Sequence, residues 1–223
     1  LTAGPQEPDA LLEVIGATNQ TPNVRATVQE VFDGLTTRSQ NRMGSLRFDL
    51  LAVNDLLSPF LSAGFYYKTF MWPRAFWEKL YEPIIRRAAG LGSLAGKADE
   101  GHYEKAFAFC DLLVIGGGPT GLMAALTAAR AGADVILADE DSRLGGSLLA
   151  NGEDIGGIAG PEWVAGVVAE LSALPNVRIL TRTSIVGAYD GGVFGALERV
   201  GLHKSPRPHL PRECFWRITA ART

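Results

Sequence analysis

The sequence has few cysteines and no excess of positive charge. Two Cys among 223 residues are too few for a disulfide framework or for a self-contained four-thiolate metal or iron–sulfur site. They indicate a reducing, intracellular compartment, and we expect the cytoplasm. Lys and Arg total 21 against 24 Asp and Glu, which leaves a net charge of −3. A chain with this balance lacks the clustered basic surface of a nucleic-acid-binding protein, so we expect no nucleic-acid partner.

Long apolar runs and a leader segment are missing as well. The most apolar early stretch, Leu56–Tyr67, contains Pro59 and is shorter than the about 20 residues that a membrane span needs. The chain begins without Met, a basic segment or an apolar segment, which argues against a signal peptide. We therefore expect no membrane contact and a start within a longer protein.

Glycine, in contrast, is abundant. The chain has 26 Gly, about 12% of its residues against a usual value of about 7%. Hydrophobic residues make up 47% and charged residues 20%, which is typical of a globular protein and excludes wholesale disorder. The character of the sequence changes along the chain, and three regions can be distinguished: 1–45, 46–109 and 110–223.

Residues 1–45 are polar and mixed in pattern. Leu11–Ile15 predicts a short strand. Between residues 24 and 35, apolar residues recur at helical spacing, whereas several β-branched side chains and the Asp33–Gly34 pair predict a hairpin. The pattern alone leaves helix and hairpin open.

Residues 46–109 predict a helical, aromatic-rich connector followed by a linker. Eight aromatic residues fall between Phe65 and Tyr81. Pro73 can open a helix, Gly90 can end one, and the apolar positions 76, 80, 84 and 88 share one helical face. This face is suited either to core packing or to the docking of a partner subunit. The small and polar residues from 91 to 102 indicate the linker.

Residues 110–223 alternate between strand and helix patterns, which is typical of an α/β fold with a parallel sheet. The later strands are short, and the turn Asp190–Gly192 joins two of them, which predicts a small antiparallel layer. The expected strands are 111–115, 134–138, 177–180, 184–188, 193–197 and 215–219, and the expected helices are 122–131 and 161–174.

The strongest functional signal is a glycine-rich turn between the first strand and the first helix of this region. Gly116, Gly118 and Gly121 form the pattern G-x-G-x-x-G, with Pro119 and Thr120 between the last two. The first glycine permits the tight turn, the second a close approach to a pyrophosphate, and the third helix–strand packing. The N-terminus of the helix then offers N–H donors and a positive dipole to the anion. This context predicts a dinucleotide site.

An acid and a second glycine pair complete the pattern. Asp139 ends the second strand, 18 residues after Gly121, where a carboxylate accepts hydrogen bonds from ribose hydroxyls; Glu140 is the neighbouring alternative. An unphosphorylated ribose favours NAD or FAD over NADP. Gly145 and Gly146 at this offset are typical of the flavoprotein-type, two-dinucleotide-binding Rossmann domain. The further candidates for the diphosphate side are Arg143 and Ser147.

We nominate no catalytic group and no metal ligand in this chain. The three His residues have no ligand-like spacing. Cys110 and Cys214 belong to no C-x-x-C motif and are expected to be small core residues. A dinucleotide fingerprint identifies a cofactor site and names no acid, base or nucleophile.

Several stretches together resemble the α subunits of heterotetrameric sarcosine oxidases. They are the aromatic run Ser58–Pro73, the segment Ile85–Gly92, the glycine-rich turn, Leu144–Leu148 and Gly187–Arg199. The aromatic run is specific to that family, whereas the glycine-rich turn is shared by many flavoproteins. The resemblance extends over essentially the whole chain.

This resemblance implies the oxidative demethylation of sarcosine to glycine with production of hydrogen peroxide. It places FAD and amine oxidation on a β subunit, FMN between the α and β subunits, and NAD on the glycine-rich turn of the α subunit. The implied partners are β, γ and δ subunits, and tetrahydrofolate would bind a C-terminal domain that lies outside this sequence. The residues alone leave NAD and FAD open, because both present ADP to the same turn.

The resemblance also implies that residues 1–45 are the tail of a truncated, cluster-free ferredoxin-like domain, with Thr27–Arg38 as a closing hairpin. Residues 110–223 would be a truncated Rossmann domain whose next strand is missing, so we expect an exposed sheet edge and marginal stability. Two alternatives remain. One is the α subunit of a related FAD-dependent dehydrogenase that oxidises proline or forms cyanide from glycine, and the other is a non-catalytic, nucleotide-stabilised scaffold.

Overall fold

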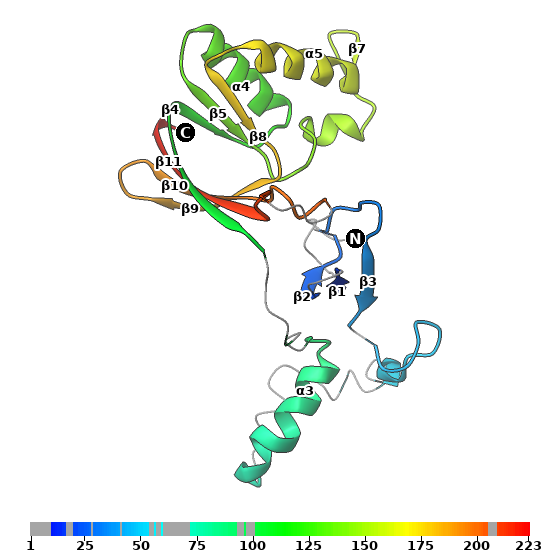
Figure 1. Cartoon of the computed structure of the whole chain (residues 1–223). Helices are drawn as coiled ribbons and strands as arrows, with labels where there is room; N and C mark the ends of the chain where they lie inside the picture. The colour runs from blue at the N-terminus through cyan, green and yellow to red at the C-terminus, as the bar shows by residue number, and fades with distance from the viewer. Residues whose placement is uncertain are drawn as a thin grey trace. The chain divides into compact units, whose positions relative to one another are not determined.

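The computed structural model of the chain forms two units, residues 1–100 and residues 101–223 (Figure 1). Within them the structure describes residues 10–16, 20–27, 29–40, 42–53, 56, 59, 72–92, 96, 101–204 and 209–223.

The first unit contains a three-stranded antiparallel sheet. Its strands are β1 (Leu11–Ile15), β2 (Gln20–Arg25) and β3 (Thr36–Ser39), in the order β2-β1-β3. The predicted strand Leu11–Ile15 is confirmed and forms the centre of the sheet. The assignment of this sheet to a ferredoxin-like domain stays a prediction.

Both predictions for residues 24–35 are wrong. In the described part of this stretch, the chain leaves β2 at Arg25 and continues through turns, without a helix and without a second strand before Asp33–Gly34. Gly34 has a φ of +86° and Leu35 N–H donates to the Phe32 carbonyl at 3.1 Å, so a turn does form there. The strand that follows, β3, pairs with β1 instead of a hairpin neighbour, because β1 offers a free second edge.

A helical segment follows, as predicted. It runs through η3 (Arg74–Phe76), the π-helical η4 (Trp77–Tyr81) and α3 (Glu82–Ala88), after a short turn of helix at η1 (Leu50–Ala52). The predicted stop at Gly90 is confirmed: its φ is +72°, and the N–H groups of Gly90 and Leu91 donate to the carbonyls of Arg87 and Arg86, both at 3.1 Å. This pairing is a Schellman ending.

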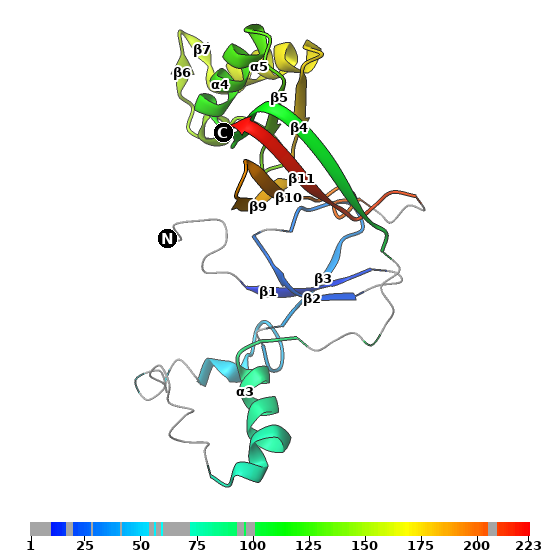
Figure 2. The same ribbon diagram turned by 90° about the vertical axis from the view of Figure 1, so that its left-hand side faces the viewer.

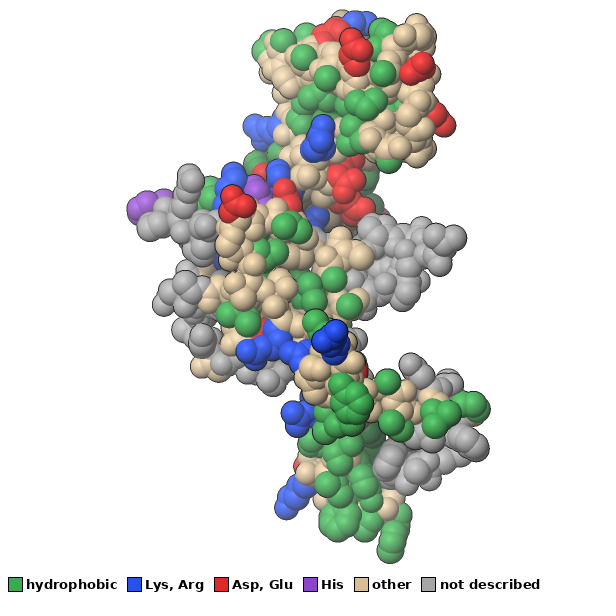
Figure 3. All heavy atoms as spheres, turned by 90° about the vertical axis from the view of Figure 1, so that its right-hand side faces the viewer, with side chains coloured by type: hydrophobic (Ala, Val, Ile, Leu, Met, Phe, Trp, Pro, Cys, Tyr) green, Lys and Arg blue, Asp and Glu red, His purple; other side chains and the backbone are tan. Residues whose placement is uncertain are grey.

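The apolar face of this helical segment is exposed where the structure describes it. Phe76, Leu80 and Ile84 are all exposed, and Figure 3 shows hydrophobic side chains gathered along this helix. Among the described residues, this apolar face therefore does not pack into a core. Four members of the aromatic run, residues 65, 66, 67 and 70, lie outside the described residues.

The second unit is built on a six-stranded mixed sheet with the order β8-β5-β4-β11-β10-β9. Four neighbouring strands are parallel: β8 (Val177–Leu180), β5 (Val135–Ala138), β4 (Tyr103–Ile115) and β11 (Glu213–Arg222). The remaining strands, β9 (Thr183–Tyr189) and β10 (Val193–Glu198), continue antiparallel from β11. The predicted antiparallel run is confirmed, but it is hydrogen-bonded to the parallel strands through β11 and forms no separate sheet.

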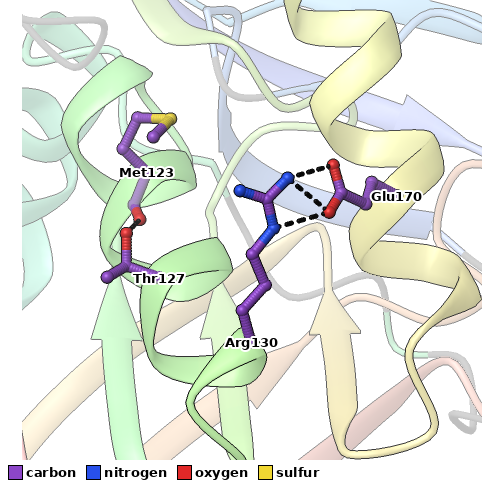
Figure 4. A network of polar contacts seen from close by, with 4 residues as sticks. All are labelled: Met123, Thr127, Arg130 and Glu170. Carbon is purple, nitrogen blue, oxygen red and sulfur yellow. Dashed lines mark hydrogen bonds and ion pairs between the residues drawn. The ribbon is translucent and has the colours of Figure 1, made fainter.

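Two helices and the strands beneath them form the main core. Leu122 and Leu126 of α4 (Pro119–Arg130) and Leu171 of α5 (Gly160–Ala173) pack with Val135 and Leu137 of β5. Arg130 and Glu170 join the two helices on the surface through hydrogen bonds of 2.7 and 2.8 Å (Figure 4).

On the opposite face of the sheet, buried side chains from the parallel and antiparallel strands form a second cluster, which includes Leu113, Ile136, Ala196 and Ile218. Three short elements lie between β5 and α5: η5 (Gly146–Leu149), β6 (Asp154–Ile155) and β7 (Ile158–Ala159).

The first strand of this unit begins earlier than predicted, at Tyr103 instead of Asp111. Residues 103–109, which precede the predicted strand 111–115 and follow the predicted linker 91–102, therefore belong to β4. Figure 2 shows the reason, because β4 and β11 run side by side over most of their length, with Tyr103 paired to Glu213 and Phe109 to Thr219. The same pairing corrects the expected open edge: β11 has a hydrogen-bonded neighbour on each side, β4 and β10.

Candidate dinucleotide-binding site

The glycine-rich turn connects β4 to α4 as predicted. Gly116 has a φ of +98°, and its N–H donates to the Ala138 carbonyl at 2.8 Å, which ties the turn to the end of β5. Gly121 lies in the first turn of α4, where a Cβ would stand 1.9 Å from the Gly116 carbonyl oxygen. Only glycine at this position lets the helix approach the turn so closely.

The N-terminus of α4 faces open space. Gly118 is the N-cap residue, Pro119 is the first helical residue, and a Cβ on Gly118 would meet nothing within 4 Å. In this fully described region, no side chain caps the helix and no acid lies in its first turn. The N–H groups of that turn, including those of the exposed Thr120 and the half-buried Gly121, therefore remain available to an anion. This uncapped N-terminus of α4, which we call the pyrophosphate cradle, fits a pyrophosphate.

The second glycine pair packs directly on the first turn. The N–H of Gly145 donates to the Gly117 carbonyl at 2.8 Å. A Cβ on Gly146 would stand 3.2 Å from the Gly118 Cα, and both Gly145 and Gly146 have positive φ angles, +129° and +53°. The structure thus brings together residues that the sequence separates by nearly thirty positions, with Ser147 exposed at the start of η5 and Arg143 exposed before it.

Asp139 connects the end of β5 to the glycine-rich turn. One carboxylate oxygen, Oδ2, accepts from the Gly117 N–H at 2.5 Å, and the other, Oδ1, accepts from the Asp141 N–H at 2.7 Å. An ionised carboxylate has about four lone-pair positions, so two remain for ribose hydroxyls. Asp139 is half-buried, whereas the side chain of Glu140 is exposed. Of the two acids, Asp139 is therefore the one whose carboxylate lies at the glycine-rich turn.

Sequence reasoning missed Gly117. It is buried, and a Cβ there would stand 2.4 Å from Leu144 Cδ2 and 3.1 Å from Asp139 Oδ2. The run of three consecutive glycines was the available signal, because G-x-G-x-x-G alone requires no glycine at its second position.

Sequence reasoning also missed the segment between β8 and β9, which holds the backbone of Asp139. The N–H of Asp139 donates to the Leu180 carbonyl at 2.9 Å, and its carbonyl accepts from the Thr183 N–H at 2.7 Å. Arg182 N–H donates to the Asp141 carbonyl at 2.9 Å. Thr183 is only 1% exposed, and its hydroxyl donates to the Thr181 carbonyl at 3.0 Å. No local pattern reveals these contacts, since they join residues about forty positions apart.

The two cysteines lie in the sheet. Burial raises the pKa of the Cys110 thiol, with the nearby Asp111 and Asp134 carboxylates adding to the shift and a backbone hydrogen bond from Ile136 opposing it. Burial also raises the pKa of the Cys214 thiol, with smaller contributions from Glu198 and Glu104. Cys214 is buried and Cys110 is half-buried, and both thiols stay protonated at neutral pH.

The described residues contain neither a metal cluster nor a membrane-spanning helix. No group of three or more His, Cys, Asp or Glu side chains is arranged to hold a metal ion in those parts of the chain. Among the described helices, none combines the length and the apolar character that crossing a membrane requires.

Comparisons with known proteins find relatives of this chain among flavin-dependent oxidoreductases. A family model described as FAD dependent oxidoreductase matches residues 111–191. Sarcosine oxidase subunit alpha of Rhizobium meliloti (strain 1021) is 59% identical over 223 residues, which are 100% of this chain and 23% of that protein. The same subunit of Corynebacterium sp. (strain P-1) is 40% identical over 134 residues, or 59% of this chain and 14% of the relative. The chain therefore spans less than a quarter of the length of these relatives.

Among solved structures, L-proline dehydrogenase from P. horikoshii is 23% identical with a TM-score of 0.39, over 57% of this chain and 24% of that one. The family match on residues 111–191, together with the parallel sheet, confirms the predicted α/β fold of the flavoprotein Rossmann type.

Proposed function

The chain belongs to the sarcosine oxidase α-subunit family, and on that premise we propose that it forms the dinucleotide-binding segment of such a subunit. The enzyme would demethylate sarcosine oxidatively to glycine with production of hydrogen peroxide, in the cytoplasm. Its partners would be β, γ and δ subunits, with FAD and amine oxidation on the β subunit and FMN at the α–β interface. Tetrahydrofolate would bind elsewhere in the α subunit.

One observation carries the proposed site: Gly118 leaves open space before the uncapped N-terminus of α4, with the Asp139 carboxylate at the adjoining strand end. We propose NAD as the ligand, because the family resemblance favours it. FAD is the alternative, since its ADP half suits the same cradle.

Each part of the site has a distinct role in this proposal. The N–H groups at the start of α4 bind the pyrophosphate, and Gly118 permits its close approach. Asp139 accepts hydrogen bonds from the adenosine ribose, and its charge disfavours a 2′-phosphate. Bound NAD would supply a nicotinamide ring that can accept hydride. The chain's own residues bind and orient the dinucleotide, and none is assigned as an acid, a base or a nucleophile.

The ligand can be identified on the full-length subunit, purified with its partners. We expect denaturation of the α subunit to release NAD, identified by mass and by absorbance without a flavin band. FAD in this site would instead favour the related dehydrogenases. Neither dinucleotide, with no binding of NAD, FAD or ADP on titration, would contradict the proposed site.

Two glycine substitutions separate binding from folding. Gly118→Ala places its Cβ in open space at a φ of −70°, so the fold should survive while the affinity for NAD falls by tenfold or more because the methyl group obstructs the pyrophosphate. Gly166→Ala, on the exposed face of α5 with nothing within 4 Å of its Cβ, is the matched control and should bind as the parent does.

Gly121→Ala provides the contrast, because its Cβ would stand 1.9 Å from a backbone oxygen and should cost about 2–3 kcal/mol of stability or more. Isothermal titration and urea denaturation would measure both effects. In the assembled enzyme, Gly118→Ala should also lower turnover. An effect on assembly alone would favour the scaffold alternative.

A further inference from the structure

Arg199 lies just beyond the end of β10, far from the glycine-rich turn in sequence, yet its side chain contacts the loop that carries Asp139. Its Nη2 donates to the Glu140 carbonyl at 2.8 Å. Its backbone N–H donates to the Arg182 carbonyl at 3.0 Å, and the Arg182 N–H in turn donates to the Asp141 carbonyl. The β8–β9 segment and Arg199 therefore form one connected support for residues 139–141.

The contact with Glu140 has a specific geometric meaning. The carbonyl of Glu140 and the N–H of Asp141 belong to the same peptide unit, which is planar. Arg199 binds the oxygen of this unit, and Oδ1 of Asp139 accepts from its nitrogen at 2.7 Å. The guanidinium thus fixes the plane that orients the carboxylate. It also polarises the amide, which strengthens the hydrogen bond on the other side.

From this geometry we propose that Arg199 is a positioning residue for the dinucleotide site and sets its selectivity for an unmodified adenosine ribose. The inference rests on the proposed function, because Asp139 must bind the ribose for its orientation to matter. Without Arg199 the 140–141 peptide can rotate, and Oδ1 of Asp139 loses its hydrogen-bond partner. The orientation of the Asp139 carboxylate is then no longer fixed. The N-terminus of α4 keeps its contacts with the pyrophosphate, so the variant loses affinity for the ribose only.

The test compares ADP with 2′-deoxy-ADP on the full-length subunit stripped of its nucleotide. The parent should bind ADP about tenfold or more tightly than the deoxy analogue, as expected for a hydrogen bond to a charged group. In Arg199→Met this ratio should fall below about threefold, mainly through weaker ADP binding. A merely structural role of Arg199 would weaken both ligands equally and leave the ratio unchanged.

The matched control is Arg130→Met, which removes another arginine of the same unit together with its paired contacts to Glu170, on the helices α4 and α5. It should keep the parental ratio. If Arg199→Met fails to fold by circular dichroism, Arg199→Lys decides, because it keeps the charge but not the planar fork and should give an intermediate ratio.

The outcomes are distinguishable. A parental ratio in a folded Arg199 variant overturns this inference and leaves the proposed site intact. A parent that binds neither ADP nor its deoxy analogue overturns the proposed site, and this inference with it.

Discussion

Single residues at the site differ in why they are needed. Gly121 is required by the protein itself, since its missing Cβ makes room for a backbone oxygen. Gly118 has free space around it, and the proposed dinucleotide would explain why it is glycine. Asp139 would serve both purposes: its carboxylate accepts from the Gly117 N–H of the glycine-rich turn, and it retains lone pairs that the proposed ribose would use. A variant at Asp139 would therefore alter both folding and binding, which makes Gly118 the sharper probe.

The cysteines give a pH prediction at the same scale. Their pKa values are raised in the folded chain, mainly by burial, so folding favours the protonated thiols. An unfolded thiol ionises near pH 8.5. The free energy of unfolding should therefore be unaffected by the thiols below that pH and should fall as pH rises through it toward the higher folded pKa values.

Urea denaturation between pH 7 and 10 measures this effect, with the double variant Cys110→Ala/Cys214→Ala as the reference for all other titrating groups. The parent should lose more stability than the double variant above pH 8.5. Parallel curves for the two proteins would contradict the raised pKa values of the two thiols.

At the scale of elements, α4 is held at both ends by different means. Its N-terminus abuts the glycine-rich turn. At its C-terminus the N–H groups of Gly132 and Ala133 donate to the carbonyls of Ala129 and Ala128, at 3.0 and 3.1 Å, and a side chain from outside the helix adds a further hydrogen bond. Asn176, in the loop before β8, donates through Nδ2 to the carbonyls of Ala129 and Ala133, at 2.9 and 2.7 Å. This side chain therefore links α4, the loop before β5 and the start of β8.

Asn176→Ala should lower the free energy of unfolding by about 1–3 kcal/mol, because the Ala133 carbonyl loses the side-chain donor and the Ala129 carbonyl keeps only its backbone donors. Urea denaturation followed by circular dichroism is the measurement. Arg130→Met is a useful comparison, since the exposed Arg130–Glu170 pair should contribute about 1 kcal/mol or less (Figure 4). Equal costs for the two variants would argue against the capping role.

The length of β4 is the property of an element that the sequence pattern predicts poorly. Residues 103–109 combine charged and aromatic side chains, and this pattern predicts no strand when the partner strand is unknown. They are a strand because β11 pairs with them from Tyr103 onward. On this part of β4, Phe107 and Phe109 are 66% and 76% exposed. These exposed rings, and not an unpaired β11, now support the prediction of marginal stability for the isolated chain.

At the scale of the whole molecule, the division into two units predicts where the Rossmann unit begins. A polypeptide of residues 101–223 should unfold cooperatively, because it contains all of β4. One of residues 110–223 should be less stable by about 3 kcal/mol or more, since it loses seven residues of pairing with β11 and the buried Ala108. Urea denaturation of the two would decide. Equal midpoints would favour the boundary at residue 110.

The sequence by itself determined the α/β order, the helices, the glycine-rich turn, and the acid and glycine pair that accompany it. These are local properties: hydrophobic period, turn chemistry and the absence of a Cβ act within a few residues. Tertiary structure decided the rest. It paired β3 with β1, extended β4 along β11, set Gly117 against Asp139, and brought Arg182, Thr183 and Arg199 to the Asp139 loop. In each of those contacts at least one partner is a backbone N–H or carbonyl that lies far away in sequence, and such a group carries no residue signature that a pattern could reveal.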